Sequence, residues 1–201
     1  MAQEVVDAIS EANMLFGNAS SMHGFGREAA FAIEQSREKI AALIECNPDE
    51  VVFTSGASEA NNTVFNIFRD AIDLGSKKNR IVTTVIEHPS ITETVKFLRK
   101  RGYRIDEVPV DKTGRVELET LATYLDEDVA LVSVMTGNNE IGTIQPIEEI
   151  TKMAHAVGAF MHTDATQAIG KIPVLMKTWG VDYMSLSGHK FYGPKGIGVL
   201  A

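Results

Sequence analysis

The chain of 201 residues has little cysteine, no excess of basic charge and no long apolar run. Cys46 is its only cysteine, so no disulfide can form within the chain, and the cytoplasm is the expected compartment. The net charge of -8 argues against nucleic acid or an anionic membrane as a partner. No apolar stretch reaches the roughly 18 residues of a membrane span, and the acidic N-terminus has no signal-peptide pattern.

Two common phosphate-binding loops are also missing. The small-residue stretch FTSGASEA (53–60) lacks the Lys-Ser/Thr pair of a nucleoside-triphosphate loop and the three spaced glycines of a dinucleotide turn. Both cofactor classes are therefore disfavoured. No Ser- or Pro-rich linker, internal repeat or low-complexity tract divides the chain, which favours one folded domain.

Strand-like and helix-like stretches alternate along the sequence. Helices of ordinary length between short apolar strands indicate an α/β fold of three layers, with a mostly parallel sheet covered by helices on both faces. We expect a helical N-terminal segment, 1–45, ahead of a domain spanning 46–201. The expected strands are 50–56, 80–88, 103–110, 129–137, 159–165 and 182–188, and the expected helices are 57–75, 90–102 (which Ser90 could cap), 116–125 and 147–158.

Polar clusters follow several of these strands. Because ligands of open parallel sheets bind outside the carboxyl ends of the strands, such clusters predict one site at one edge. They are TSGASEANN, EHPS, TGNNEIG, HTDATQ and SGHK.

Most of these residues also permit a purely structural interpretation. Ala57 and Ser58 could present N–H groups to a phosphate or only begin a helix. Asp164 could hold a protonated ring nitrogen or cap the next helix, while Gln167 could donate a hydrogen bond to a ring hydroxyl. His88 could stack on a planar ring or form a hydrogen-bonded turn.

The loop TGNNEIG and Lys190 provide the remaining candidate residues of the predicted site. Asn138 and Asn139 could reach a ring substituent or order their loop, and Glu140 is expected to tie that loop to the scaffold. Lys190 carries an amine that is a poor nucleophile at its usual pKa of about 10.4 but can bond to an aldehyde cofactor. A phosphate cradle, a ring-nitrogen aspartate, a stacking imidazole and such a lysine are together what pyridoxal 5'-phosphate requires. Lys195, past the Gly-Pro turn, is expected on the surface.

The residues that carry these features resemble the NifS/IscS-like cysteine desulfurases, a branch of the class V pyridoxal-phosphate-dependent aminotransferase family. The resemblance is nearly continuous and is most specific in the last three of its motifs. These motifs are GNASSMHGFGREA (17–29), VVFTSGASEANN (51–62), EHPS (87–90), GNNEIGTIQPI (137–147), HTDATQAIGKIPV (162–174) and SLSGHKFYGPKGIGVL (185–200).

The resemblance implies a role for each matching position. Lys190 matches the lysine that binds the cofactor covalently, Asp164 the partner of the ring nitrogen, and His88 the stacking imidazole. Gln167 and Asn139 match the ligands around the ring hydroxyl. The positions that match the phosphate-binding set are Ala57, Ser58, Ser187 and His189, with Ser58 where many relatives carry threonine.

The implied reaction takes sulfur from L-cysteine, leaving L-alanine and a persulfide on an enzyme cysteine, for iron–sulfur clusters or thio-cofactors. A homodimer and a sulfur-acceptor protein are the implied partners. The chain spans about half of the family's length and does not include the catalytic cysteine loop, the substrate-binding arginine or the small domain. Cys46 lies far from the position of that loop, so we expect it to be structural and expect negligible desulfuration by this chain alone.

Two alternatives remain open from the residues. The chain could be a non-catalytic cofactor-binding remnant or interaction module that keeps the fold without turnover. It could also serve another class V activity on an amino acid, such as a lyase or a transaminase.

Overall fold

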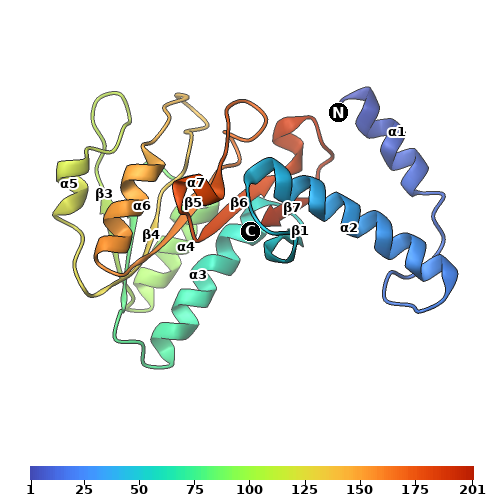
Figure 1. Cartoon of the computed structure of the whole chain (residues 1–201). Helices are drawn as coiled ribbons and strands as arrows, with labels where there is room; N and C mark the ends of the chain where they lie inside the picture. The colour runs from blue at the N-terminus through green and yellow to red at the C-terminus, as the bar shows by residue number, and fades with distance from the viewer.

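A single seven-stranded sheet organises the computed structural model, which describes all residues 1–201 (Figure 1). The strand order is β1-β7-β6-β5-β4-β2-β3. The strands are β1 (Val52–Thr54), β2 (Arg80–Thr84), β3 (Arg104–Val108), β4 (Val129–Ser133), β5 (Phe160–Asp164), β6 (Tyr183–Ser187) and β7 (Gly198–Leu200).

The directions of the strands bring the predicted polar clusters to one edge. Strands β6, β5, β4, β2 and β3 are parallel, whereas β7 runs antiparallel to both of its neighbours, β6 and β1. Two antiparallel steps restore the original direction, so the carboxyl end of β1 lies at the same edge as those of the parallel strands.

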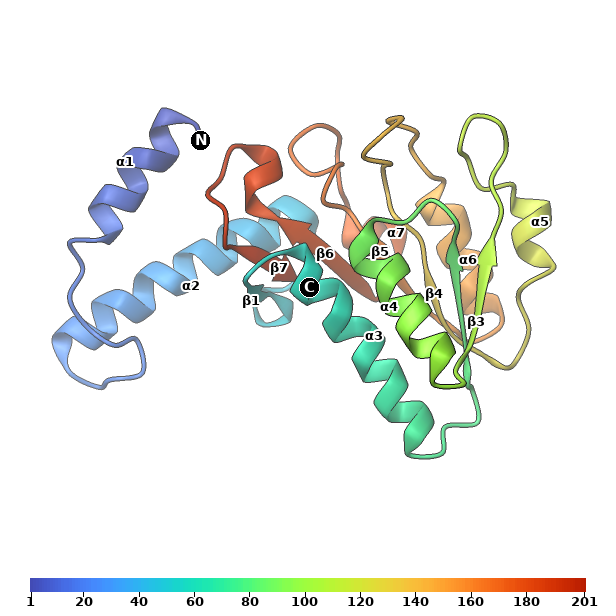
Figure 2. The same cartoon turned by 180° about the vertical axis from the view of Figure 1, so that it is seen from behind.

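Helices cover both faces of this sheet, as Figures 1 and 2 show. One face carries α3 (Ala57–Asp73) and α4 (Pro89–Lys100), whose apolar residues pack on the sheet in a cluster around Phe65. The other face carries the C-terminal part of α2 (Gly24–Ile44), together with α5 (Leu118–Ala122), α6 (Ile147–Ala156) and α7 (Met176–Trp179). The central strand β4 is buried along its whole length, as a strand covered on two faces must be. The predicted three-layer α/β architecture is confirmed.

The N-terminal segment is helical and leaves the body of the molecule. Helix α1 (Gln3–Ala12) has no buried residue, and α1 and the first part of α2 project beyond the edge of the sheet (Figures 1 and 2). The end of α2 is different, because Ala41 and Ile44 are buried in the main core. Helix α2 thus reaches into the sheet domain, and the predicted division at residue 45 stays a prediction.

Two local expectations need correction. The strand expected over 80–88 ends at Thr84, and the following helix is capped by His88, not by Ser90. The His88 ring accepts a hydrogen bond from Ser90 N at 3.1 Å, because Pro89 occupies the first helical position and has no N–H to offer. None of the helices is both long enough and apolar enough to cross a membrane.

Candidate active site

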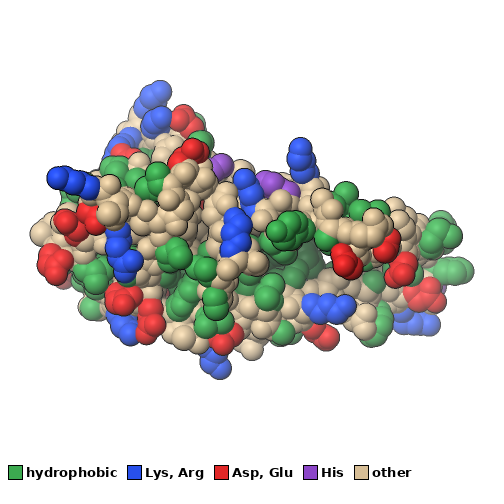
Figure 3. Space-filling model, turned by 90° about the horizontal axis from the view of Figure 1, so that it is seen from above, with side chains coloured by type: hydrophobic (Ala, Val, Ile, Leu, Met, Phe, Trp, Pro, Cys, Tyr) green, Lys and Arg blue, Asp and Glu red, His purple; other side chains and the backbone are tan.

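A cavity opens at the shared carboxyl edge of the strands. Including its mouth, the empty space is about 340 Å³, and seven of the nine predicted site residues line it. Figure 3 looks onto this edge and shows histidine and basic side chains near its middle. The lining residues are Ala57, Ser58, His88, Met135, Gly137, Asn139, Asp164, Thr166, Gln167 and Lys190.

Asp164 is the buried acid of this cavity, at the end of β5 and only 4% exposed. Its Oδ1 accepts a hydrogen bond from Thr166 N at 3.0 Å, and its Oδ2 accepts one from Asn61 Nδ2 at 2.7 Å. The carboxylate therefore orders the turn that follows it and also meets a distant helix. Such N–H donors stabilise an ionised carboxylate, which can in turn attract a cation in the cavity.

Thr166 carries an unused polar atom in the same wall. Its hydroxyl oxygen is buried and has no hydrogen-bond partner within the protein. Since buried polar atoms are normally paired, this orphaned hydroxyl suits a polar ligand.

The N-terminus of α3 forms another wall. Ala57 and Ser58 are its first two residues, and the first N–H groups of a helix have no intrahelical acceptor. The hydroxyl of Ser55, by contrast, donates to Glu59 Oε2 at 2.6 Å and so does not point to a ligand. N–H groups at this helix end can accept an anion.

Ser187 and His189 are the two predicted residues that do not line the cavity. Their side chains instead bond to each other, with Ser187 Oγ 2.9 Å from His189 Nδ1. Ser187 ends β6, next to the turn at Gly56, where a Cβ would stand 3.8 Å from its hydroxyl. The pair therefore lies beside the α3 wall but is engaged internally.

The two amide side chains of the cavity are oriented by charged neighbours. Lys171 Nζ donates to Gln167 Oε1 at 2.8 Å, and Asn139 Nδ2 donates to Glu140 Oε1 at 2.7 Å. An ammonium can only donate and a carboxylate can only accept, so Gln167 keeps its NH₂ and Asn139 keeps its carbonyl oxygen for a ligand. Glu140 is thus bound within its own loop.

Asn138 orders that loop. Its Oδ1 accepts hydrogen bonds from the backbone N–H groups of Glu140 and Ile141, and its Nδ2 donates to Ile86 O at 3.0 Å. Asn138 is 8% exposed and does not line the cavity, so of its two interpretations the structural one is correct.

Lys190 and His88 are the two basic side chains of the cavity, and both are exposed. Lys190 belongs to the short 3-10 helix Gly188–Phe191 that follows β6. His88 caps α4 through Nδ1 and also lines the cavity, so the hydrogen-bonded turn is confirmed and the stacking role stays a prediction. Lys195 is exposed and does not line the cavity, as expected.

Comparison with known proteins identifies the group to which this architecture belongs. The family model described as aminotransferase class V matches residues 1–201. The chain belongs to the class V aminotransferases. Members of this family generally depend on pyridoxal phosphate, and the buried carboxylate, the orphaned Thr166 hydroxyl, the helix N–H groups and the Lys190 amine are a donor set that fits such a cofactor.

Individual class V relatives point to one branch. A cysteine desulfurase IscS from Dictyoglomus turgidum is 48% identical over 185 residues, which are 92% of this chain and 46% of the relative. A solved NifS-like protein superposes with a TM-score of 0.93 at 41% identity, covering 100% of this chain and 55% of that one. A solved SspA in complex with cysteine gives a TM-score of 0.92 at 35% identity, covering 100% and 57%. The resemblance inferred from the motifs is confirmed, and the chain spans about half the length of these relatives.

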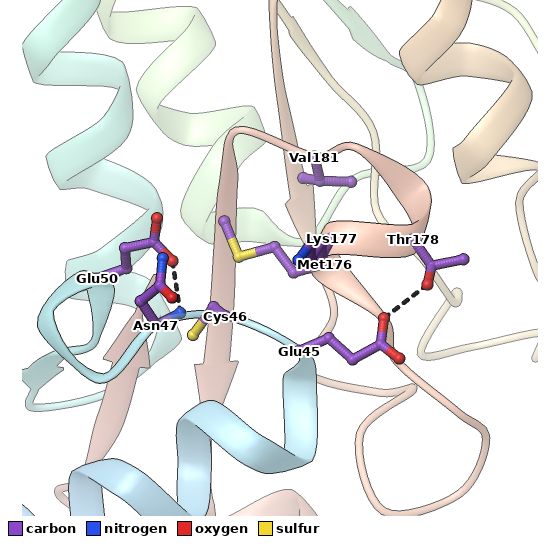
Figure 4. Close-up of a pocket in the computed structure, with 8 residues that line it drawn as sticks. All are labelled: Glu45, Cys46, Asn47, Glu50, Met176, Lys177, Thr178 and Val181. Carbon is purple, nitrogen blue, oxygen red and sulfur yellow. Dashed lines mark hydrogen bonds between the residues drawn. The ribbon is translucent and has the colours of Figure 1, made fainter.

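A larger cavity of this class V chain lies elsewhere. Including its mouth, its empty space is about 1380 Å³, and it is formed around Cys46, between the end of α2 and helix α7 (Figure 4). Glu45 accepts a hydrogen bond from Thr178 there, and Glu50 accepts one from Asn47 N. Burial, aided by the charges of Glu50 and Asp49, raises the pKa of the Cys46 thiol to about 11, so the thiolate that nucleophilic chemistry needs is scarce.

Four residues that line the cavity or support it were not predicted from the sequence. Met135, Gly137 and Thr166 line the cavity, and Asn61 binds Asp164 from α3. Thr166 and Gly137 lie in the polar clusters HTDATQ and TGNNEIG. Their closeness in sequence to Asp164 and Asn139 could have indicated that they line the cavity. Asn61 also lies within such a motif, TSGASEANN, but its contact with Asp164 could not be predicted, because it depends on how α3 crosses the end of β5.

Proposed function

We propose that this chain is the cofactor-binding part of a pyridoxal-phosphate-dependent cysteine desulfurase. The observation that carries the proposal is the single cavity shared by the Lys190 amine, the buried Asp164 carboxylate and the N-terminus of α3. The names of the curated relatives and the cysteine bound by the solved SspA support the choice of an amino-acid thiol as substrate. When bound, pyridoxal phosphate withdraws electrons from the α-carbon of an amino acid.

Each wall would hold one part of the cofactor. Lys190 would bind it covalently through Nζ, and Asp164 would pair with the ring nitrogen. The NH₂ of Gln167 and the carbonyl of Asn139 would lie near the ring hydroxyl, with His88 stacked on the ring. The phosphate group would be held by Ala57, Ser58, Ser187 and His189, the last two after release of their mutual hydrogen bond.

The proton chemistry would rest on two atoms of this chain. His88 Nδ1 accepts the Ser90 N–H, so Nε2 is the ring atom left to carry and exchange a proton. Lys190 Nζ is the second, because it lies in the same cavity and amines are among the groups that act as general acids and bases.

The proposed reaction converts L-cysteine to L-alanine and passes the sulfur to an enzyme cysteine as a persulfide. Cys46 is unsuited to that role, since it lies in a different cavity and its pKa is raised. We further propose that the enzyme works as a cytoplasmic homodimer that supplies a sulfur-acceptor protein, with residues 46–201 as the cofactor domain and 1–45 as a separate helical segment.

A pair of lysine variants tests the proposal. With added pyridoxal phosphate, the wild type should gain a visible absorption band that survives gel filtration and changes when L-cysteine, but not L-serine, is added. Lys190→Ala should lose the band, whereas Lys195→Ala, five residues along the same loop, should keep it. A wild type that stays colourless with excess cofactor would contradict the proposal, and so would an equal band in Lys190→Ala.

A further inference from the structure

Glu87 is a buried carboxyl group with no part in the proposed chemistry. It lies between the end of β2 and His88, and the whole residue is 6% exposed. Its Oε1 accepts hydrogen bonds from Thr84 Oγ1 at 2.5 Å and from Met135 N at 3.0 Å. Its other oxygen, Oε2, is buried and has no partner.

These contacts join two walls of the cavity. Thr84 is the last residue of β2, and Met135 follows β4, so the Glu87 side chain bridges the ends of two neighbouring parallel strands. His88, next to Glu87 in the chain, lines the cavity, and so does Met135 itself. The bond from Asn138 Nδ2 to Ile86 O is a second tie between the same two segments. Movement of Glu87 would therefore shift His88 relative to Met135.

The carboxyl group is best accommodated without a charge. Burial raises the pKa of Glu87 to about 8, although the bonds from Thr84 and Met135 act in the opposite direction, and the negative charge of Asp164 raises it further. No cation pairs with Glu87, and the other titratable groups at this cavity are His88 and Lys190. Ionisation would make Glu87 a second negative carboxylate within reach of the charge of Asp164, with no cation beside it.

We propose that Glu87, as an uncharged carboxylic acid, is a positioning residue that holds His88 and Met135 at the distance the cofactor requires. The inference rests on the proposed function, because it concerns the binding of pyridoxal phosphate. Glutamine reproduces the accepting oxygen and cannot ionise, so Glu87→Gln isolates the effect of the charge. Glu93→Gln makes the same change at an exposed position of α4 and serves as the control.

The test is the dissociation constant of pyridoxal phosphate between pH 6.5 and 9.5. If only the uncharged form binds well, about a tenth of the wild type is competent at pH 9, and its affinity falls about tenfold relative to Glu87→Gln. Below pH 7 the wild type and Glu87→Gln should bind pyridoxal phosphate equally well. Glu93→Gln should have the affinity of the wild type at every pH. A constant ratio of wild type to Glu87→Gln across this range would overturn the proposal, because a bridge of purely structural value would not depend on the charge.

A measurement without cofactor separates this inference from the proposed function. The imidazole NMR signals of His88 should shift with an inflection near pH 8 in the wild type and lack that inflection in Glu87→Gln. If this inflection is present but no cofactor binds, the proposed function fails and Glu87 still positions His88. If the signals of both proteins titrate identically, Glu87 does not act on His88 and the positioning role is wrong.

Discussion

Asn61 donates a 2.7 Å hydrogen bond to Asp164 across 103 positions of sequence. The same amide group donates to Ser90 Oγ at 2.9 Å, so one fully buried side chain joins α3, α4 and the end of β5. The bond gives Asp164 Oδ2 its donor within the protein, while Oδ1 is occupied by the turn at Thr166. Asn61 therefore holds the acid of the candidate site in position.

Removing that amide should destabilise the protein. In Asn61→Ala, a buried carboxylate oxygen loses its donor, which costs about 1–3 kcal/mol, and more where the acceptor is charged. Urea unfolding should show the loss as a lower midpoint with an unchanged slope. Asn66→Ala, on the same helix and bonded only to Arg69, should change stability much less. If the two substitutions lower the unfolding midpoint equally, the hydrogen bond to Asp164 does not contribute more to stability than the bond to Arg69.

Asp164→Asn should weaken binding of pyridoxal phosphate by at least about tenfold, because a neutral amide cannot pair with a protonated ring nitrogen as a carboxylate does. The new amide can also turn a donor toward Asn61, so stability should fall together with affinity.

The exchanged double variant Asn61→Asp, Asp164→Asn separates these two effects. It restores an amide-to-carboxylate bond but moves the charge away from the ring, so stability should recover in part and affinity should not. Recovery of cofactor affinity in the double variant would exclude Asp164 as the partner of the ring nitrogen.

Acid should destabilise the protein through His162, which lies two residues before Asp164 on β5. Its ring is fully buried, 2.8 Å from Ser133 Oγ and 3.0 Å from Ser185 Oγ, and burial lowers its pKa to about 4, opposed by the charge of Asp164. In the unfolded chain the His162 ring takes up a proton near pH 6.5, whereas in the folded protein the ring stays uncharged down to about pH 4. The free energy of unfolding therefore falls as the pH drops from about 6.5 to 4.

The measurement is the free energy of unfolding in urea at several pH values. His162→Gln should show a shallower decline over this window, although it should be less stable at pH 7 because the two serine contacts are altered. A decline of the same steepness in both proteins would place the acid sensitivity on other groups.

Cys46 should react slowly with alkylating agents. A pKa of about 11 instead of the usual thiol value of 9.0 reduces the thiolate fraction at pH 8 about a hundredfold. Iodoacetamide labelling followed by mass spectrometry should show this difference against a free thiol, and Cys46→Ser should leave cofactor binding unchanged. Rapid labelling at neutral pH, or loss of the cofactor band in Cys46→Ser, would contradict a structural role.

Much of the fold could be predicted because its signals are local. The β-branched run at 80–84 and the apolar spacing of 64–72 report strand and helix within a few residues, and the alternation of the two indicates a covered parallel sheet. The boundary errors at 84–90 are local too. His88 and Ser90 both have side chains that can cap a helix, and only the backbone around Pro89 decides between them.

The amino-acid sequence by itself determined the three-layer architecture and the types of side chain placed at the strand ends, since hydrophobic period and turn composition act over short distances. Only the tertiary structure decided that Asn61 meets Asp164, that Glu87 joins Thr84 to Met135, and that Ser187 and His189 bond to each other outside the cavity wall. The first two join different secondary-structure elements and the last lies in the bend after β6. The first depends on how α3 crosses the sheet, the second on the pairing of β2 with β4, and the third on the turn of the backbone after β6. The residue pattern within any one segment does not specify these arrangements.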